Sequence, residues 1–134
     1  MSEQENTKLV KSAYEAFQSG NIQGVLDRCT DNIEWVEEGP SDIIELSGKR
    51  TGKPGVAEFF SKLDESETFH EFSPKEFIAQ GNKVVVLGFY KTTVKSTNRP
   101  CQSNWVHVFT IQGGKISHFH EYFDTAAAVE AYKK

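Results

Sequence analysis

The sequence predicts an α+β fold in which three N-terminal helices pack on the concave face of a strongly curved, mostly antiparallel sheet. Three observations predict this fold. Apolar residues recur at helical spacing in the first half of the chain, strand-like alternation fills the second half, and turn residues separate the alternating runs at hairpin-like distances. Helices that precede a run of strands in this order cover one side of an antiparallel sheet.

Three early segments carry the i, i+3, i+4, i+7 apolar stripe of an amphipathic helix, at residues 10–17, 22–29 and 56–63. Gly20 should end the first helix in the left-handed conformation, and Asn21 should cap the second, so their connection is very short. Pro54 suits the first turn of the third helix because its missing amide hydrogen is not needed there. Asp124 or Thr125 can cap a short helix at the end of the chain.

Residues 33–38 alternate as a strand whose one face is apolar apart from Glu37. The turn-rich segment 39–51 predicts a long loop over the mouth of a pocket. Later runs predict a meander of strands at 68–72, 76–80, 84–93, 105–111 and 116–123. Turns at Ser73-Pro74 and Gly113-Gly114 separate some of these strands. Gly88 predicts a bulge or a sharp bend in its strand.

The composition predicts a single domain that spans residues 1–134. Hydrophobic residues make up 37% of the chain and charged residues 25%, which is typical of soluble proteins. The net charge is −4 and no basic stripe occurs, so a nucleic-acid partner is not expected. The N-terminus lacks the pattern of a secretion signal, and no stretch approaches the roughly 20 apolar residues of a membrane span. A cytoplasmic protein without membrane contact is therefore expected.

The closing pair of strands carries ionisable residues among large apolar ones. Alternation places Phe119, Glu121 and Phe123 on one face of the last strand, and His118, His120 and Tyr122 on the other. His107 lies between Trp105 and Phe109 on the preceding strand. If the two strands share a face, His107 and Glu121 point together into an apolar environment.

The order of elements resembles the nuclear transport factor 2-like superfamily of cone-shaped α+β domains. Within that superfamily, the chain is most similar to the SnoaL-like, ketosteroid isomerase-related proteins. The residues that carry the resemblance are 14–17 with Gly20-Asn21, 31–35, 105–109 and 114–124, and the likeness covers nearly the whole chain. It implies a cone-shaped sheet and a homodimer formed through the outer sheet face, on which Tyr122 lies.

The resemblance also assigns site residues. The catalytic base of ketosteroid isomerase corresponds to Glu37, and its protonated aspartate corresponds to His107. The face that the family turns inward carries Glu121, which would be a second interior carboxylate. The helix-one tyrosine of the isomerase corresponds to Ala13, and the adjacent Tyr14 is rotated from it by about 100°.

We therefore predict His107, Glu121 and Glu37 as catalytic residues. One carboxylate should orient His107, whose other ring nitrogen should face the substrate. The predicted ligand contacts are aromatic and come from several elements: Tyr14, Trp35, Phe89, Trp105, Phe109, Phe119 and Phe123. The expected reaction is a cofactor-independent proton transfer on a small, largely apolar molecule, as in isomerisation, cyclisation, dehydration or hydrolysis.

Other interpretations of the same residues remain open. The glutamates could reach solvent at the open end of the cone or form a structural network with His107, and the aromatic residues could simply fill the core. The protein would then be a non-catalytic carrier or sensor, or a structural dimerisation module. His118 and His120 allow a metal interpretation, but they should face away from the pocket, so neither a metal nor a cofactor is expected.

Overall fold

The computed structural model describes residues 2–134. Helices and strands follow one another along the chain as α1 (Glu3–Gln18), α2 (Ile22–Asp27), β1 (Cys29–Glu37), β2 (Gly48–Thr51), α3 (Gly52–Ser66), β3 (Glu67–Gln80), β4 (Lys83–Val94), β5 (Arg99–Gln112), β6 (Lys115–Phe123) and α4 (Thr125–Tyr132). In this range the strands form one six-stranded sheet in the order β2-β1-β6-β5-β4-β3. Neighbouring strands are antiparallel except for β1 and β6, which are parallel. The predicted fold class is confirmed.

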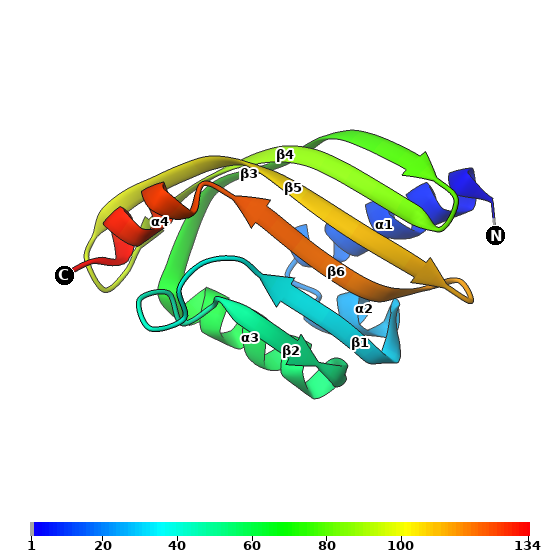
Figure 1. Cartoon of the computed structure of the whole chain (residues 1–134), viewed down its shortest axis with the longest axis horizontal. Helices are drawn as coiled ribbons and strands as arrows, with labels where there is room; N and C mark the ends of the chain where they lie inside the picture. Colours follow the sequence, from blue (N-terminus) through cyan, green and yellow to red (C-terminus); the bar gives the residue numbers. More distant parts are fainter. Residues whose placement is uncertain (1) are drawn as a thin grey trace.

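The helices lie on the predicted side of the sheet. Helix α1 lies against β3 and β4, and helix α3 lies against β1, so both are on the concave side of the curved sheet (Figure 1). The short link between α1 and α2 also forms as expected. Gly20 has a φ of 78°, and the Asn21 side chain accepts a hydrogen bond from the Gly24 amide. The fourth helix begins after Asp124, whose side chain accepts a hydrogen bond from the Ala127 amide.

One predicted turn is wrong. Residues 68–72 and 76–80 belong to a single long strand, β3, and Ser73-Pro74 lies inside it. β3 is an edge strand, where the missing amide hydrogen of a proline leaves no ladder bond unmade. The pairing of β3 with β4 shifts register between Pro74 and Glu76, so the proline marks a bulge and not a turn.

The other predicted strands differ less from the structure. The first strand begins earlier than predicted, at Cys29, and the segment 39–51 contains the short strand β2 at its end. Gly113 and Gly114 have φ values of 58° and 79°, and they make the two-residue connection between β5 and β6. The register then shifts by one residue between Thr110 and Ile111, so the turn and this bulge together set His107 opposite Glu121.

None of the helices in the described range combines the length and apolar character that a membrane crossing requires.

Candidate functional site

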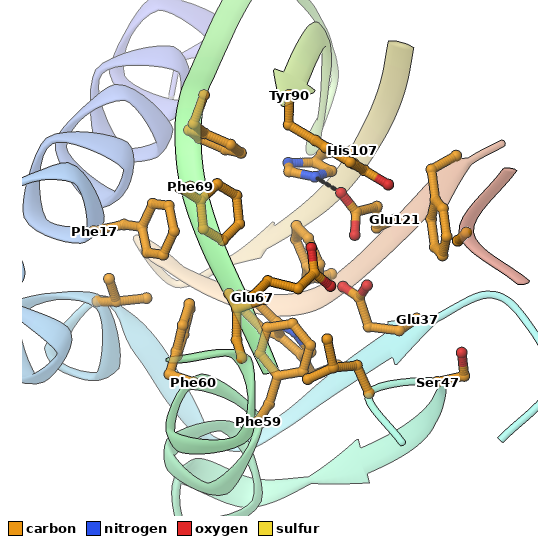
Figure 2. Close-up of a pocket in the computed structure, with 18 of the residues that line it drawn as sticks. Phe17, Glu37, Ser47, Phe59, Phe60, Glu67, Phe69, Tyr90, His107 and Glu121 are labelled. Atoms are coloured by element: carbon orange, nitrogen blue, oxygen red, sulfur yellow. Dashed lines mark hydrogen bonds and ion pairs between the residues drawn. The ribbon is translucent and has the colours of Figure 1, made fainter. Parts of the chain in front are cut away.

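An internal cavity of about 100 Å³ lies between the helices and the concave face of the sheet. Most of its wall is aromatic or aliphatic. Among the predicted site residues, those that line it are Tyr14, Trp35, Glu37, His107, Phe109, Phe119, Glu121 and Phe123. Figure 2 shows the side chains of His107, Glu121 and Glu37 directed into the same space from three different strands. Phe89 and Trp105 do not line the cavity.

Phe89, a predicted ligand contact, lies outside the wall of this cavity. Along β4, the inward positions are the buried Val84, Val86 and Tyr90, so strand alternation turns Phe89 toward the outer face. There the ammonium group of Lys75 lies 5.5 Å from the centre of the Phe89 ring. Tyr90, the next residue, occupies the cavity wall instead.

Trp105, the other predicted ligand contact outside the cavity wall, is buried and only 1% exposed. Its indole stacks on the His107 ring at 3.8 Å between ring centres and on the Phe72 ring at 5.1 Å. Its far side lies directly over Gly88, where any side chain would collide with it. Position 88 therefore requires a glycine, because the Trp105 indole lies too close to the backbone there for any side chain. The expected bulge lies opposite it, on β3. Trp105 supports His107 from behind.

His107 is the centre of a buried hydrogen-bond network. Its Nε2 lies 2.7 Å from Glu121 Oε2, and its Nδ1 lies 2.7 Å from the Tyr14 hydroxyl. The histidine is only 5% exposed. Because both ring nitrogens have protein partners, the expectation that one of them faces a substrate is wrong. His107 orients its two neighbours, and the carboxyl groups face the cavity.

Tyr14 reaches this network although it lies one residue beyond the position predicted from the resemblance. Burial, followed by the nearby charge of Glu121, raises the pKa of the Tyr14 phenol well above its ordinary value. The phenol therefore keeps its proton. Its hydroxyl shares a hydrogen bond with His107 Nδ1, while His107 Nε2 lies at hydrogen-bond distance from the Glu121 carboxyl group.

Glu37 and Glu121 are register partners on the parallel strands β1 and β6. Burial raises the pKa of Glu37 well above the ordinary range, and the charge of Glu121 and their shared hydrogen bond raise it further. Burial acts in the same direction on Glu121. The charge of His107 and hydrogen bonds from Glu37 and His107 outweigh it, so the pKa of Glu121 is lowered. The pKa values of these two neighbouring carboxyl groups thus shift in opposite directions.

A third carboxyl group, Glu67, was missed in the sequence. It lies at the start of β3 and faces the cavity beside Glu37 (Figure 2). Its Oε1 accepts a hydrogen bond from Thr92 Oγ1 at 2.8 Å, and its Oε2 accepts one from the Tyr132 hydroxyl of helix α4. Burial raises the pKa of Glu67 despite these hydrogen bonds. In the sequence, the alternation of Glu67 with Phe69 indicates that both side chains lie on the same face of a strand. Glu67 directly follows helix α3, so the start of the strand was not recognised there.

Further aromatic residues of the wall come from helices whose apolar stripes predicted only core packing. They are Phe17 of α1 and Phe59 and Phe60 of α3. Helical periodicity shows which face is buried but not whether the face meets a cavity or another side chain.

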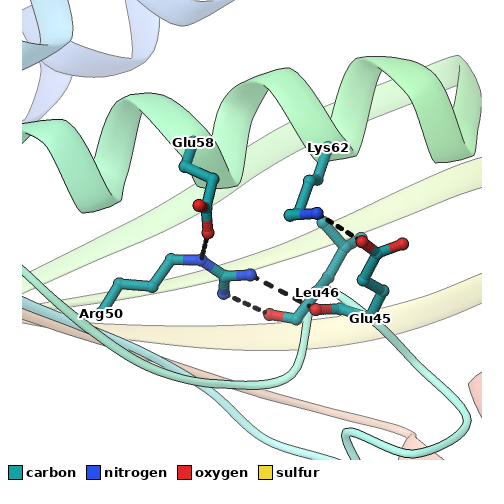
Figure 3. A network of polar contacts seen from close by, with 5 residues as sticks. All are labelled: Glu45, Leu46, Arg50, Glu58 and Lys62. Carbon is teal, nitrogen blue, oxygen red and sulfur yellow. Dashed lines mark hydrogen bonds and ion pairs between the residues drawn. The ribbon is translucent and has the colours of Figure 1, made fainter.

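The loop between β1 and β2 contributes Ile44, Leu46 and Ser47 to the cavity wall, so it covers part of the cavity as expected. Arg50 holds this loop against helix α3 (Figure 3). Its guanidinium donates to the Leu46 carbonyl at 2.8 Å and lies 3.5 Å from the Glu58 carboxylate. Lys62 of the same helix contacts the Glu45 carboxylate. The two contacts attach the loop to α3 at neighbouring points.

The outer face of the sheet carries the residues that alternation turned away from the cavity. His118 Nδ1 lies 3.6 Å from Glu34 Oε2, and His120 Nε2 lies 2.5 Å from Glu38 Oε2. Tyr122 stacks on His120 with 4.1 Å between ring centres. These histidines pair with carboxylates of β1 and its continuation, and they are separate from the His107 network.

The raised pKa of Glu37 predicts a pH-dependent stability. In the unfolded chain this carboxyl ionises near pH ~4.3, whereas the folded protein retains the proton to a higher pH. Between these two values only the folded state binds the proton, so its stability decreases as pH rises. Glu37→Gln keeps a hydrogen-bond donor but has no carboxyl group to ionise, so it should not lose stability in this way as pH rises. Urea unfolding should show the variant gaining stability over the wild type from pH 4 to pH 8.

The control for this prediction is Glu76→Gln, which removes one charge from an exposed position on β3. Its stability profile should run parallel to that of the wild type. A parallel profile for Glu37→Gln as well would contradict a raised pKa at position 37.

Comparison with protein families places this geometry in context. Residues 10–119 match the family described as SnoaL-like domain. The chain belongs to the SnoaL-like family. Among solved structures, this SnoaL-like chain is similar to an NTF2-like protein from Burkholderia xenovorans, with 36% identity, 99% of each chain covered and a TM-score of 0.89. No curated protein sequence matches it.

Two further structures extend the comparison. An NTF2-like protein of unknown function from Burkholderia pseudomallei is 28% identical over the full length of both chains, with a TM-score of 0.87. TerC, which was co-crystallised with polyporic acid, is 26% identical over 97% of this SnoaL-like chain and 99% of its own, with a TM-score of 0.86. Both structures share the fold of this chain over nearly its whole length.

Proposed function

We propose that this protein binds a small, largely apolar molecule in its internal cavity and transfers a proton on it. The observation that supports the proposal most directly is the pairing of Glu37 with Glu121. Two adjacent carboxyl groups whose pKa values shift in opposite directions supply an acid and a base at the same pH. A salt bridge that only stabilises the fold joins groups of opposite charge. Here two carboxyl groups lie side by side in an apolar cavity.

The roles of the three predicted catalytic residues follow from their contacts. Glu121 is ionised and accepts the proton, and Glu37 is protonated and donates one. His107 contacts Glu121 and Tyr14 rather than the ligand, so it is a positioning residue that holds the carboxylate in place. The aromatic walls exclude water and strengthen each of these interactions. Isomerisation, cyclisation, dehydration and hydrolysis all include a proton transfer that such a pair can perform.

The small volume of the cavity favours a compact ligand. Known ligand pockets range from roughly 300 to 1,000 Å³, whereas this cavity measures about 100 Å³. A ligand with a single ring would fit with little movement of the walls. A larger one would require the loop held by Arg50, or the helices, to move outward.

The proposal is tested by a binding and exchange screen. Polyporic acid is one probe, because the 26% identical TerC was co-crystallised with it. Single-ring ketones form the other group, since their α-carbon protons exchange with D₂O when a base removes them. We expect NMR to show faster deuterium incorporation in the presence of the protein. Binding without any exchange across the panel would favour the alternative, a non-catalytic carrier.

We also propose that the protein is a homodimer formed through the outer sheet face. Tyr122 supports this, because it is a large aromatic residue that is 46% exposed on the convex side of the sheet. Tyr122→Glu would introduce a charge into the interface, so sedimentation velocity should show a shift from dimer to the 15.1 kDa protomer. Tyr122→Phe keeps the ring and should remain dimeric. A wild-type protein that sediments as a monomer would contradict the proposed dimer.

A further inference from the structure

A second space adjoins the internal cavity on the side of the helices. It is an open groove of about 930 Å³ between the end of α1, the start of α2, helix α3 and the first half of β3. We call it the outer groove. Its polar margin includes Gln18, His70 and Lys95, which do not line the cavity. These residues therefore report on the groove alone.

The cavity and the outer groove share one wall. Six residues line both spaces: Phe17, Phe60, Leu63, Glu67, Phe69 and Phe72. A side chain that borders two spaces separates them only by its own thickness, so this wall is a single layer of side chains. Four of the six residues are phenylalanines, and we call these four the aromatic partition.

Phe17 connects the other rings of the aromatic partition. Its ring centre lies 5.6 Å from that of Phe60, 6.1 Å from that of Phe69 and 5.1 Å from that of Phe72. Phe17 comes from α1, Phe60 from α3 and the other two from β3. Figure 2 shows the rings of Phe17, Phe60 and Phe69 together beside the cavity. Removal of the Phe17 ring would therefore leave a gap between two helices and a strand.

Apolar contacts hold the rings of the partition, whereas hydrogen bonds fix the backbone around it. Gln18 Nε2 donates to the Phe72 carbonyl at 3.1 Å, which ties the end of α1 to β3. Lys95 Nζ donates to the Asp64 carbonyl at 2.7 Å, which ties the end of β4 to α3. Phe17 is half-buried, and rotation of a side chain is faster than movement of a helix or a strand. The rings are therefore able to part while the backbone stays in place.

We infer that the aromatic partition is the entrance of the cavity, and that the Phe17 ring sets the size of the ligand that the cavity accepts. The cavity, at about 100 Å³, is smaller than known ligand pockets of roughly 300 to 1,000 Å³, whereas the outer groove lies within that range. A single-ring ligand would pass the partition and lie wholly inside. A ligand of two linked rings would need the space that Phe17 occupies. The inference rests on the proposed binding in the cavity and adds an entry route and a specificity-determining residue.

The test compares p-cresol with 4-phenylphenol, which carries a phenyl ring in place of the methyl group. The wild-type protein should bind p-cresol more tightly, because the second ring does not fit behind the partition. Phe17→Ala joins the cavity to the groove. It should bind 4-phenylphenol at least about ten-fold more tightly than the wild type, the scale on which apolar volume in a pocket discriminates ligands. Isothermal titration calorimetry measures both affinities.

NMR locates the second ring and measures the rate of entry. In Phe17→Ala, 4-phenylphenol should shift the amide resonances of His70 and Lys95, which border only the groove, and p-cresol should leave them in place. Line-shape analysis should show faster association of p-cresol with this variant than with the wild type. Phe123→Ala is the matched control, because Phe123 lines the cavity but not the groove. It should keep the wild-type association rate, and 4-phenylphenol should not shift its groove resonances.

The outcomes separate this inference from the proposed function. If p-cresol binds but Phe17→Ala takes 4-phenylphenol no better than the wild type, or takes it without shifting the groove resonances, the size limit is overturned while ligand binding stands. If Phe123→Ala speeds p-cresol association as much as Phe17→Ala does, the entrance is overturned. If neither phenol binds to any of these proteins, the inference and the proposed binding both fail. Phe17→Leu keeps an apolar side chain and should show the same changes to a smaller extent if Phe17→Ala does not fold.

Discussion

Glu121→Gln is expected to reduce proton transfer by at least about 100-fold, the range that a positioned acid or base contributes. The amide has the shape of the carboxyl group, but it cannot accept a proton from carbon. Its carbonyl oxygen still accepts the hydrogen bond from His107 Nε2, so the fold should be retained. The rate of deuterium incorporation into the best ketone of the panel, measured by NMR, checks this prediction.

Glu76→Gln is the matched control, because it makes the same chemical change at an exposed position on β3. It should exchange the ketone at the wild-type rate. Glu37→Gln should be intermediate, since its amide can still donate a hydrogen bond to Glu121 but has no proton to transfer. If Glu121→Gln retained the wild-type rate within a few-fold, the base would have to be a different group.

Gly88→Ala is expected to cause the largest loss of stability among the single changes considered. A Cβ atom at this position would lie 2.2 to 2.6 Å from three atoms of the Trp105 indole. The indole is held between the β4 backbone and the rings of His107 and Phe72, so it cannot move away without disturbing them. Inserting one carbon into such a site costs about 3 kcal/mol of unfolding free energy. Urea denaturation measures this loss directly.

A second change separates the collision from any general effect of alanine at this position. Trp105→Leu removes the ring, and in that background Gly88→Ala should cost little. The double-mutant cycle should therefore give a large coupling energy between the two positions. Equal costs in the two backgrounds would show that crowding against Trp105 is not the cause.

The helices and most of the strands could be predicted from local patterns. Periodicity and capping residues located α1, α2 and α3, and the Gly113-Gly114 turn located the closing hairpin. The prediction failed at Pro74 because an isolated proline indicates a turn in most contexts. Only the order of strands shows that β3 is an edge strand, where a proline is tolerated.

The site was predictable only in part. Strand alternation identified the inward faces that carry Glu37, His107 and Glu121, because side chains on a strand alternate strictly between two faces. Alternation did not decide between Phe89 and Tyr90, since both are aromatic and the face of β4 depends on its partners. It also did not distinguish a ring that lines the cavity from one that lies behind it, as Trp105 does.

The sequence by itself determined the α+β class, the family resemblance and the group of ionisable residues on apolar faces, because each of these depends on spacing along the chain. Only the tertiary structure decided what those residues do to one another. It paired both nitrogens of His107, set Glu37 beside Glu121 and added Glu67 from a distant strand. A pKa depends on distances and burial in three dimensions, so the opposite shifts of Glu37 and Glu121 arise only in the folded chain.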